Sequence, residues 1–229
     1  DEIQSIKNWE TAVRKLRDSE QHKIFITGSS SKLLSSELST LLSGRHLSYQ
    51  LLPLSFSEYL SFHNVVVADK KDMVLKSGEL INYFGEYLKT GGFPEAVLSN
   101  NLELVKQYYY DIVQKDIMAR YDVRDKDMLE KMGVFLFSNS AKTLSVSALS
   151  KLYNLSHQTA ANYIGYFKDA FLFFDLPQFS YSLKTTQKAF KKMYAVDTGM
   201  ANAVSMSFSE DRGRMLENAV FLHLKRAGG

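Results

Sequence analysis

The chain has 229 residues, of which 45% are hydrophobic and 13% aromatic, and its net charge of +3 is too weak to signal a polyanion partner without local clusters. This composition excludes a disordered chain, and the absence of cysteine from the sequence excludes disulfides and cysteine-based metal sites. With no apolar run near the roughly 20 residues of a membrane span, and an acidic opening unlike a signal peptide, we expect a folded cytoplasmic protein without a membrane partner.

The first 53 residues are predicted to form a helix followed by a strand–helix–strand unit. Apolar residues at helical spacing predict an amphipathic helix over residues 6–18. The apolar run Ile24–Thr27 is typical of a buried parallel strand, and a Gly28-Ser29 turn follows it. Leucines at helical spacing predict the next helix, between Leu33 and Leu42, and His46–Leu52 is the predicted returning strand. Ligands bind at the carboxyl ends of strands in such units, so the polar tip is a candidate site.

Helices dominate the prediction for residues 54–125. Ser55 is expected to cap the first of them, and the sequence Thr90-Gly91-Gly92-Phe93-Pro94 interrupts the pattern sharply. A charged turn at residues 122–127 is the best internal domain boundary. The predicted helices cover residues 56–63, 73–88, 95–99 and 102–120.

Three helices followed by a two-stranded ribbon are predicted after that turn, which is the element order of a winged helix. A short helix capped by Asp197 or Thr198 and an amphipathic helix over residues 214–225 complete the chain. The three helices are residues 128–138, 145–152 and 156–170, and the ribbon is residues 171–174 with 179–183, returning at 193–196.

The predicted winged helix offers two kinds of nucleic-acid candidates. Gln158 and Asn162 lie on its third helix, where both side chains could read adenine in a major groove. Four lysines within nine residues, with no acid among them, lie at the expected wing tip, where phosphates of duplex DNA would be met. The helix itself is nearly uncharged, so docking of a partner protein remains the alternative. The four lysines are Lys184, Lys188, Lys191 and Lys192.

Polar residues of the first 45 positions match what an ATPase site requires. ATP hydrolysis of the P-loop type needs an acid on Mg²⁺, a second acid to polarise water, a polar sensor at the next strand and an arginine from a neighbouring subunit. Asp1 and Glu2 precede by about 25 residues a strand that ends in Thr27-Gly28-Ser29, and Arg45 follows the next helix. Taken singly, these residues also fit an exposed acidic terminus, a helix cap and a surface arginine.

Longer strings along nearly the whole chain resemble one family. They are IFITGSSSKLL, LLSGR, LLPLSFSEYL, GGFPEAV, YYYDIVQKDIMARYDVRD, LFSNSAK, YAVDTGMANAV and GRMLENAVFLHLKR. Together they resemble AAA+-type P-loop ATPases of the archaeal-ATPase-like group that carry a C-terminal domain of unknown function. The resemblance implies ATP and Mg²⁺ as cofactors and a homo-oligomer as the intact assembly.

The resemblance also implies roles for individual residues. Asp1 and Glu2 match the Walker B pair, with Asp1 on the metal ion. Thr27 or Ser29 takes the place of the sensor-1 residue, and Arg45 that of the arginine finger.

Two further segments follow from the resemblance. Gly92-Phe93-Pro94 is similar to a lid motif that lies against the adenine, so Gly92 and Pro94 become nucleotide-binding candidates. Residues 212–225 resemble the first helix of a restriction-nuclease-like fold, with Glu217 as its acidic position. No G-x-x-x-x-G-K-[ST] motif occurs in the sequence, so we expect a fragment that is not competent for ATP hydrolysis alone.

We therefore expect a mainly α fold with some β: part of an AAA+ α/β core and a helical lid, followed by a winged-helix domain. The expected divisions are residues 1–53 (ATPase core), 54–125 (lid and connecting helices), 126–206 (winged helix) and 207–229 (start of a nuclease-like domain). The expected function is an ATPase that couples nucleotide state to the winged helix. The alternative is a DNA-binding or protein-docking regulator with a vestigial ATPase part.

Charged landmarks in the long helix have a structural interpretation. Asp111, Asp116, Arg120 and Arg124 are expected to form an intramolecular ion-pair and capping network rather than a catalytic group.

Overall fold

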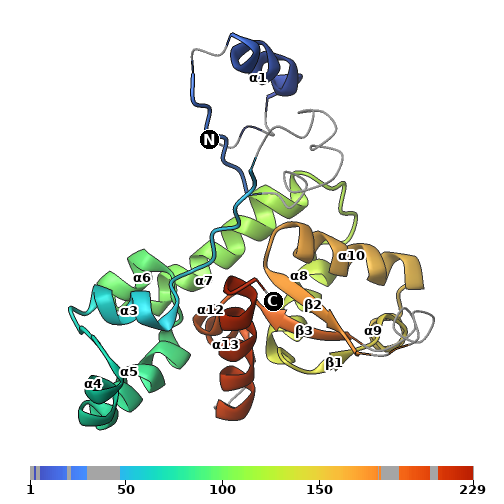
Figure 1. Cartoon of the computed structure of the whole chain (residues 1–229). Coiled ribbons are helices and arrows are strands. Elements are labelled where there is room, and N and C mark those ends of the chain that lie inside the picture. The colour runs from blue at the N-terminus through green and yellow to red at the C-terminus, as the bar shows by residue number, and fades with distance from the viewer. Residues whose placement is uncertain are drawn as a thin grey trace.

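The computed structural model describes residue 3 and residues 6–19, 22–29, 47–179, 181, 191–206 and 211–228. It confirms a mainly helical fold with a small three-stranded sheet (Figure 1). The described elements are α1 (Trp9–Asp18), α3 (Phe56–Phe62), α4 (Lys70–Leu75), α5 (Ser77–Thr90), α6 (Pro94–Ser99), α7 (Leu102–Asp111), η3 (Ile112–Met118), α8 (Lys126–Ser138), β1 (Thr143–Leu144), α9 (Val146–Leu152), α10 (His157–Asp169), β2 (Phe173–Pro177), β3 (Lys191–Ala195), α12 (Thr198–Val204) and α13 (Arg212–Arg226).

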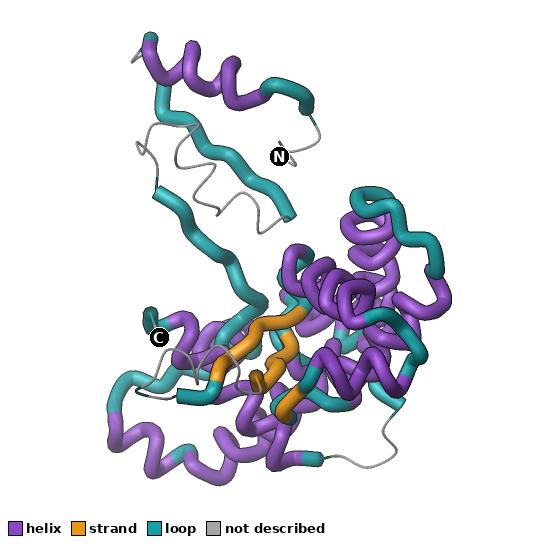
Figure 2. The backbone as a smooth tube through the Cα atoms, turned by 90° about the vertical axis from the view of Figure 1, so that its right-hand side faces the viewer, coloured by secondary structure: helices purple, strands orange, loops and turns teal. Residues whose placement is uncertain are grey.

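The segment that carries α1 stands apart from the helical body in both views (Figures 1 and 2). It has a small apolar cluster of its own, in which Trp9 is buried against Ile3, Val13 and Ile26. The predicted amphipathic helix is confirmed, although it begins at Trp9 rather than at residue 6.

The predicted strand–helix–strand unit is wrong in its strands. Residues 22–28 and 47–52 form no strand, and Phe25 and Leu51 are 88% and 94% exposed. A parallel strand requires a ladder of hydrogen-bonding neighbours and apolar layers on its faces, and these segments belong to no sheet within the described residues. The backbone N–H of Ile3 does donate to Thr27 O, at 3.3 Å. The predicted intervening helix lies outside the described residues.

Helices α3, α5 and α6 pack through aromatic side chains. Tyr59 and Tyr87 are buried, with ring centroids 5.3 Å apart, and Phe56 lies against both. The predicted Ser55 cap is confirmed as a capping box, because Ser55 and Glu58 each accept a hydrogen bond from the other's backbone N–H. The predicted helix over residues 73–88 is two helices, α4 and α5, which meet at Lys76.

The predicted long helix over residues 102–120 is α7 continued by the π-helix η3. Its inner face is fully buried through Val105, Tyr109, Val113 and Ile117. A π-helix turn is rare and shifts the side chains that follow it relative to an α-helix, so the periodicity alone did not reveal it.

The elements from α8 to β3 follow the order helix, strand, helix, helix, strand, strand, and the helices α12 and α13 come after them. The sheet is antiparallel with order β1-β3-β2, and Phe173 pairs with Ala195 while Thr143 pairs with Lys192. The predicted ribbon is present as β2 and β3, whereas the two-residue β1 was not predicted. Helix α13 covers β3, and the buried amide of Asn218 bonds both backbone groups of Ala195, at 2.8 and 2.9 Å.

One apolar core extends from Ala96 to Val204 and includes side chains of α7, η3, α8, α10, both long strands and α12. It therefore contains residues from both sides of the charged turn at 122–127. The two parts of the chain on either side of this turn are packed against each other rather than joined by a free linker.

Candidate functional site

The ATP-site candidates are only partly within the described residues. Asp1, Glu2 and Arg45 lie outside them, and Asp1 was the expected metal ligand. Thr27 and Ser29 lie at the end of the extended segment 22–29, where Thr27 is exposed and Ser29 is partly buried. The Ser29 hydroxyl donates to the Oδ1 of Asp116 in η3 at 3.0 Å, which brings this segment onto the helical body.

The Gly91-Gly92 turn lies at a closely packed junction between the end of α5, Leu54 and the start of α12. Gly91 has a φ of +73°, and a methyl group on it would lie 2.0 Å from the Asp197 carboxylate. A methyl group on Gly92 would lie 2.3 Å from Leu54 O. Gly199 is as tightly constrained, because its methyl group would lie 2.1 Å from Thr90 O. Glycine is therefore required at Gly92 and Gly199 by the close approach of another backbone, and at Gly91 by its positive φ and the adjacent carboxylate.

Asp197 holds this junction from the N-terminus of α12. Its Oδ2 accepts the Gly92 N–H at 2.7 Å, and its Oδ1 accepts the Met200 N–H at 2.8 Å as the helix cap. Asp197 is only 3% exposed. Burial raises the pKa of its carboxyl to about 6, although hydrogen bonds from Gly92, Met200 and Gly199 and the nearby Arg226 oppose the shift.

Further hydrogen bonds fasten the end of α5 to its surroundings. Leu54 N–H donates to Gly92 O at 2.7 Å, and the Tyr87 hydroxyl donates to Leu54 O at 2.9 Å. Asn202 of α12 donates to the carbonyls of Leu88 and Lys89, both at 3.0 Å. Burial raises the pKa of Tyr87 to about 12, so its hydroxyl remains a donor at neutral pH.

These contacts bear on Gly92 and Pro94 as nucleotide-binding candidates. The N–H and C=O of Gly92 are both used inside the protein, and Gly92 is buried, so its backbone offers no open polar group. Pro94 is exposed at the first position of α6. Of the nucleotide-site candidates, the described residues thus include Thr27, Ser29, Gly92 and Pro94.

The nucleic-acid candidates are brought to exposed positions, and several are already paired. Gln158 donates to Asn162 at 2.8 Å, so the two side chains bond each other along α10. Lys191 pairs with Asp175 and Lys192 with Glu217, at 2.7 and 2.6 Å. Lys184 and Lys188 lie outside the described residues.

Sequence reasoning missed the acids that face these lysines. It found no acid within the lysine run, but Asp175 comes from the neighbouring strand β2 and Glu217 from α13. Asp175 also pairs with Lys168, at 2.7 Å. Burial would raise the pKa of Asp175, but hydrogen bonds from the two lysines outweigh it and lower this pKa. The available signal was the acid on the neighbouring strand, because pairing of β2 with β3 places Asp175 opposite Met193 and diagonally across from Lys191, within reach of its long side chain.

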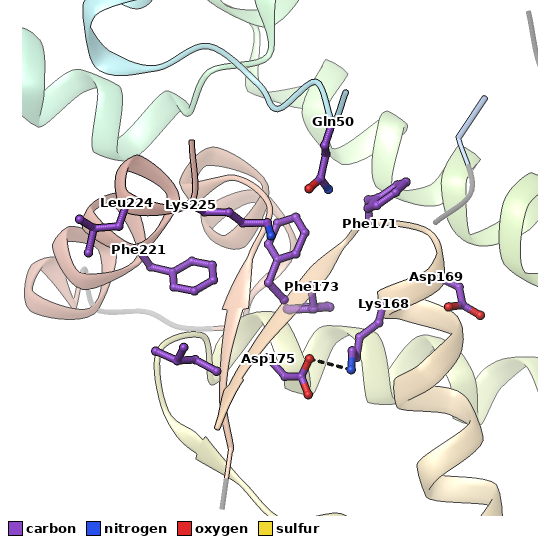
Figure 3. Close-up of a pocket in the computed structure, with 11 residues that line it drawn as sticks. Gln50, Lys168, Asp169, Phe171, Phe173, Asp175, Phe221, Leu224 and Lys225 are labelled. Carbon is purple, nitrogen blue, oxygen red and sulfur yellow. Dashed lines mark ion pairs between the residues drawn. The ribbon is translucent and has the colours of Figure 1, made fainter. Parts of the chain in front are cut away.

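A groove of about 630 Å³ lies between β2, α13 and the incoming segment at Gln50 (Figure 3). Aromatic side chains of Phe171 and Phe221 line it, and the Lys168–Asp175 ion pair lies at its edge. The ammonium of Lys225 lies 4.5 Å from the centre of the Phe174 ring, a cation–π contact. This groove was not predicted from the sequence, because its lining residues come from three segments that are distant along the chain.

Neither a metal cluster nor a bilayer-spanning helix is found in the described part of the chain. No group of three or more His, Asp or Glu side chains there is arranged to hold a metal ion. The helices there are also too short or too polar to cross a membrane. Glu217, the expected acid of a nuclease-like helix, accepts from Lys192 and from the Tyr194 hydroxyl at 2.8 Å, so it is engaged within the fold.

Comparison with known proteins finds matches to two parts of the chain. Residues 1–60 match an AAA domain. "Uncharacterized protein MJ1544" of Methanocaldococcus jannaschii is 43% identical over the whole chain, which covers 52% of that protein. An "Uncharacterized protein" of Haemophilus influenzae is 34% identical, again over the whole chain and 57% of that protein. The chain thus spans about half the length of these curated relatives. No solved structure matches it.

A second match covers residues 81–211, more than half of the chain and most of the continuous core. The chain therefore belongs to the family described as "Domain of unknown function (DUF8612)", preceded by an AAA domain.

Proposed function

We propose that this chain is part of an ATP-binding AAA+-type ATPase of the archaeal-ATPase-like group, in which nucleotide state controls the helical body that follows. The match of residues 1–60 to an AAA domain carries this proposal. The hydroxyls of Thr27 and Ser29 support it, since both end the segment where a sensor residue is expected. Because the phosphate-binding motif does not occur in this sequence, hydrolysis is assigned to the longer protein.

In this proposal Asp1 and Glu2 supply the Walker B acids, with Mg²⁺ on Asp1, and Arg45 acts on the nucleotide of a neighbouring subunit. The chemistry of the bound group would be phosphoryl transfer from ATP to water. The residues of this chain would orient water, sense the γ-phosphate and stabilise its charge across a homo-oligomer interface.

We assign a winged-helix module to residues 126–206. Support comes from the order α8, β1, α9, α10, β2, β3 and from the sheet order β1-β3-β2, with a helical pair, α9 and α10, before the ribbon. Residues 54–125 would then be the lid, and α13 the start of a nuclease-like domain.

The test of the ATPase assignment uses the full-length protein with Arg45→Ala. We expect ATP binding to remain and turnover to fall by about 10³-fold or more. Mixing Arg45→Ala with a Glu2→Gln variant should restore part of the activity, because some interfaces then combine an intact Glu2 with a neighbour's intact Arg45. Unaltered turnover in Arg45→Ala, or no recovery on mixing, would contradict the assignment of Arg45.

For the winged-helix module, protein docking is favoured over DNA binding. Lys168 and Lys191 share an ion pair with Asp175, and Lys192 is paired with Glu217, which weakens the attraction of these lysines for phosphates. The groove beside them is lined with aromatic side chains, as expected of a protein-binding surface.

Titration against duplex DNA at several salt concentrations distinguishes the two. We expect no salt-dependent binding. Binding whose salt slope falls by about one unit for each of Lys188, Lys191 and Lys192 that is neutralised would instead support DNA contact.

A further inference from the structure

One hydrogen bond joins the AAA segment, the described residues among 3–29 within the AAA match, to the helical body. Ser29 and Asp116 are 87 residues apart, and the Ser29 Oγ donates to Asp116 Oδ1 at 3.0 Å. The apolar cluster around Trp9 is separate from the continuous core. Within the described residues, the Ser29–Asp116 hydrogen bond is a polar contact that ties segment 22–29 to the helical body.

The element that receives this contact is the π-helix η3. Its inner residues Val113 and Ile117 are fully buried in the continuous core, while Asp116 lies on the partly exposed outer side. π-helix turns are rare and frequently occur at functional sites. A displacement of Asp116 would act directly on a helix that is built into the core.

Asp116 also contacts Arg120, which lies four residues later, just after the end of η3. Their side chains form an ion pair at 3.7 Å and are 20% and 22% exposed. The Nη1 of Arg120 is buried and has no hydrogen-bond partner within the described residues. Arg120 thus has donor capacity left with which to take up the carboxylate whenever Ser29 withdraws.

A second ion pair with the same four-residue spacing, between Asp111 and Lys115, has no partner outside its own helix within the described residues. Asp111 and Lys115 form a pair at 3.0 Å, and Asp111 also accepts from Gln107. These partners are all local to α7 and η3, on an exposed face. Asp111 therefore serves as a matched control for Asp116.

From this geometry we propose that Asp116 is a positioning residue. It holds the end of segment 22–29 at Ser29 and transmits the position of Ser29 to η3 through Arg120. The inference rests on the proposed ATPase function, because Ser29 is its sensor candidate. When nucleotide draws the Ser29 hydroxyl away, Asp116 closes onto Arg120 and the outer turn of η3 tightens. Two alternative hydrogen-bond arrangements of one carboxylate provide the two states that such coupling requires.

Hydrogen exchange in the full-length protein tests this, with ATP binding measured alongside. In the unaltered protein, ATP should slow exchange of the amides of residues 112–121 by roughly tenfold, equivalent to about 1.4 kcal/mol. Asp116→Asn should abolish this response and leave ATP affinity within about twofold. Ser29→Ala, compared at ATP concentrations that saturate it, should abolish the response as well. Ser29→Thr keeps the hydroxyl and Asp111→Asn changes only the local pair, so both should retain the response.

Each other outcome overturns a defined part of the argument. An unchanged response in Ser29→Ala and Asp116→Asn, or an unaltered protein that binds ATP without any response in η3, would refute the coupling alone. If the unaltered protein bound no ATP, the proposed function would fail, and this inference with it. Ser29 lies outside the continuous core, so we expect Ser29→Ala to fold. The test therefore remains decisive even if Asp116→Asn does not fold.

Discussion

Gly92 donates its backbone N–H to the carboxylate of Asp197 at 2.7 Å, across 105 residues of sequence. The bond closes the end of α5 onto the start of α12, and both partners are buried. Neither residue contributes apolar surface of any size, so what the pair adds to the junction is close backbone approach and one carboxylate. The resemblance assigned Gly92 to nucleotide binding, whereas its contacts in this structure are those of a structural joint.

Replacing Asp197 by asparagine should destabilise the protein. The carboxylate accepts from Gly92 with one oxygen and from Met200 with the other, and an amide can replace only one of these acceptors. The other N–H would be left buried and facing an NH₂ group, at a cost of about 1–3 kcal/mol. Urea unfolding at pH 7 measures it. Asp125→Asn is the control, since Asp125 caps α8 at an exposed position and accepts one backbone bond.

The difference in unfolding free energy between the unaltered protein and Asp197→Asn should depend on pH. The pKa of Asp197 is about 6 in the folded state and 3.8 as the ordinary value, so the folded state holds this proton more tightly. Stability due to Asp197 should therefore increase as the pH falls from about 6 to 4, by up to about 3 kcal/mol. Subtracting the unfolding free energy of Asp197→Asn at each pH removes the other acids. A difference that stays flat or decreases over this range would show that Asp197 has no raised pKa.

Gly199→Ala should be strongly destabilising, whereas Gly165→Ala should not. A methyl group at Gly199 would lie 2.1 Å from the backbone carbonyl of Thr90, which is too close without movement of α12. A methyl group at Gly165, within α10, meets nothing within 4 Å and should stabilise the helix by about 0.5–1 kcal/mol. We expect Gly199→Ala to cost at least 2 kcal/mol, roughly the cost of overpacking. Thermal unfolding of the two variants checks both signs, and equal melting temperatures would contradict the packing argument.

Sequence patterns predicted the elements whose signals are local. The Ser55 cap, the break at Gly91-Gly92 and the helix at α13 were each marked by neighbouring residues, and each is present. The strand at Ile24–Thr27 was predicted from apolar residues alone, but a strand also requires a ladder of paired backbone groups, and this segment joins no sheet within the described residues.

The site could be predicted only where one residue carries the signal. Ser29 was identified from its place after an apolar run, but its partner Asp116 lies in a helix 87 residues away. The same holds for Lys191, whose neutralising acid, Asp175, comes from the neighbouring strand. Such pairs depend on topology and on a π-helix turn, and no spacing rule within one segment reveals them.

Tyr109→Phe should be neutral or stabilising despite complete burial of the side chain. The Tyr109 hydroxyl has no hydrogen-bond partner within the described residues, and burial raises its pKa well above the ordinary value. Removing a hydroxyl that is buried and unsatisfied recovers its desolvation cost, about 1 kcal/mol. Tyr87→Phe is the matched comparison, because its hydroxyl donates to Leu54 O and its loss should destabilise. Chemical denaturation of both variants gives opposite signs if this reasoning holds, and a destabilised Tyr109→Phe would reveal a further partner for that hydroxyl.

Trp9→Ala should release the segment that carries α1 without unfolding the helical body. Trp9 is 6% exposed and packs on Ile3, Val13 and Ile26, a cluster separate from the continuous core. Truncating a buried tryptophan costs about 3–5 kcal/mol, more than so small a cluster is expected to withstand. Limited proteolysis should therefore cut within residues 6–29 at least tenfold faster, while the melting temperature of the body stays within about 2 °C. Leu16→Ala, at a half-exposed position of the same helix, should change neither quantity. A body that melts much earlier in Trp9→Ala would show instead that the AAA segment and the helical body unfold as one cooperative unit.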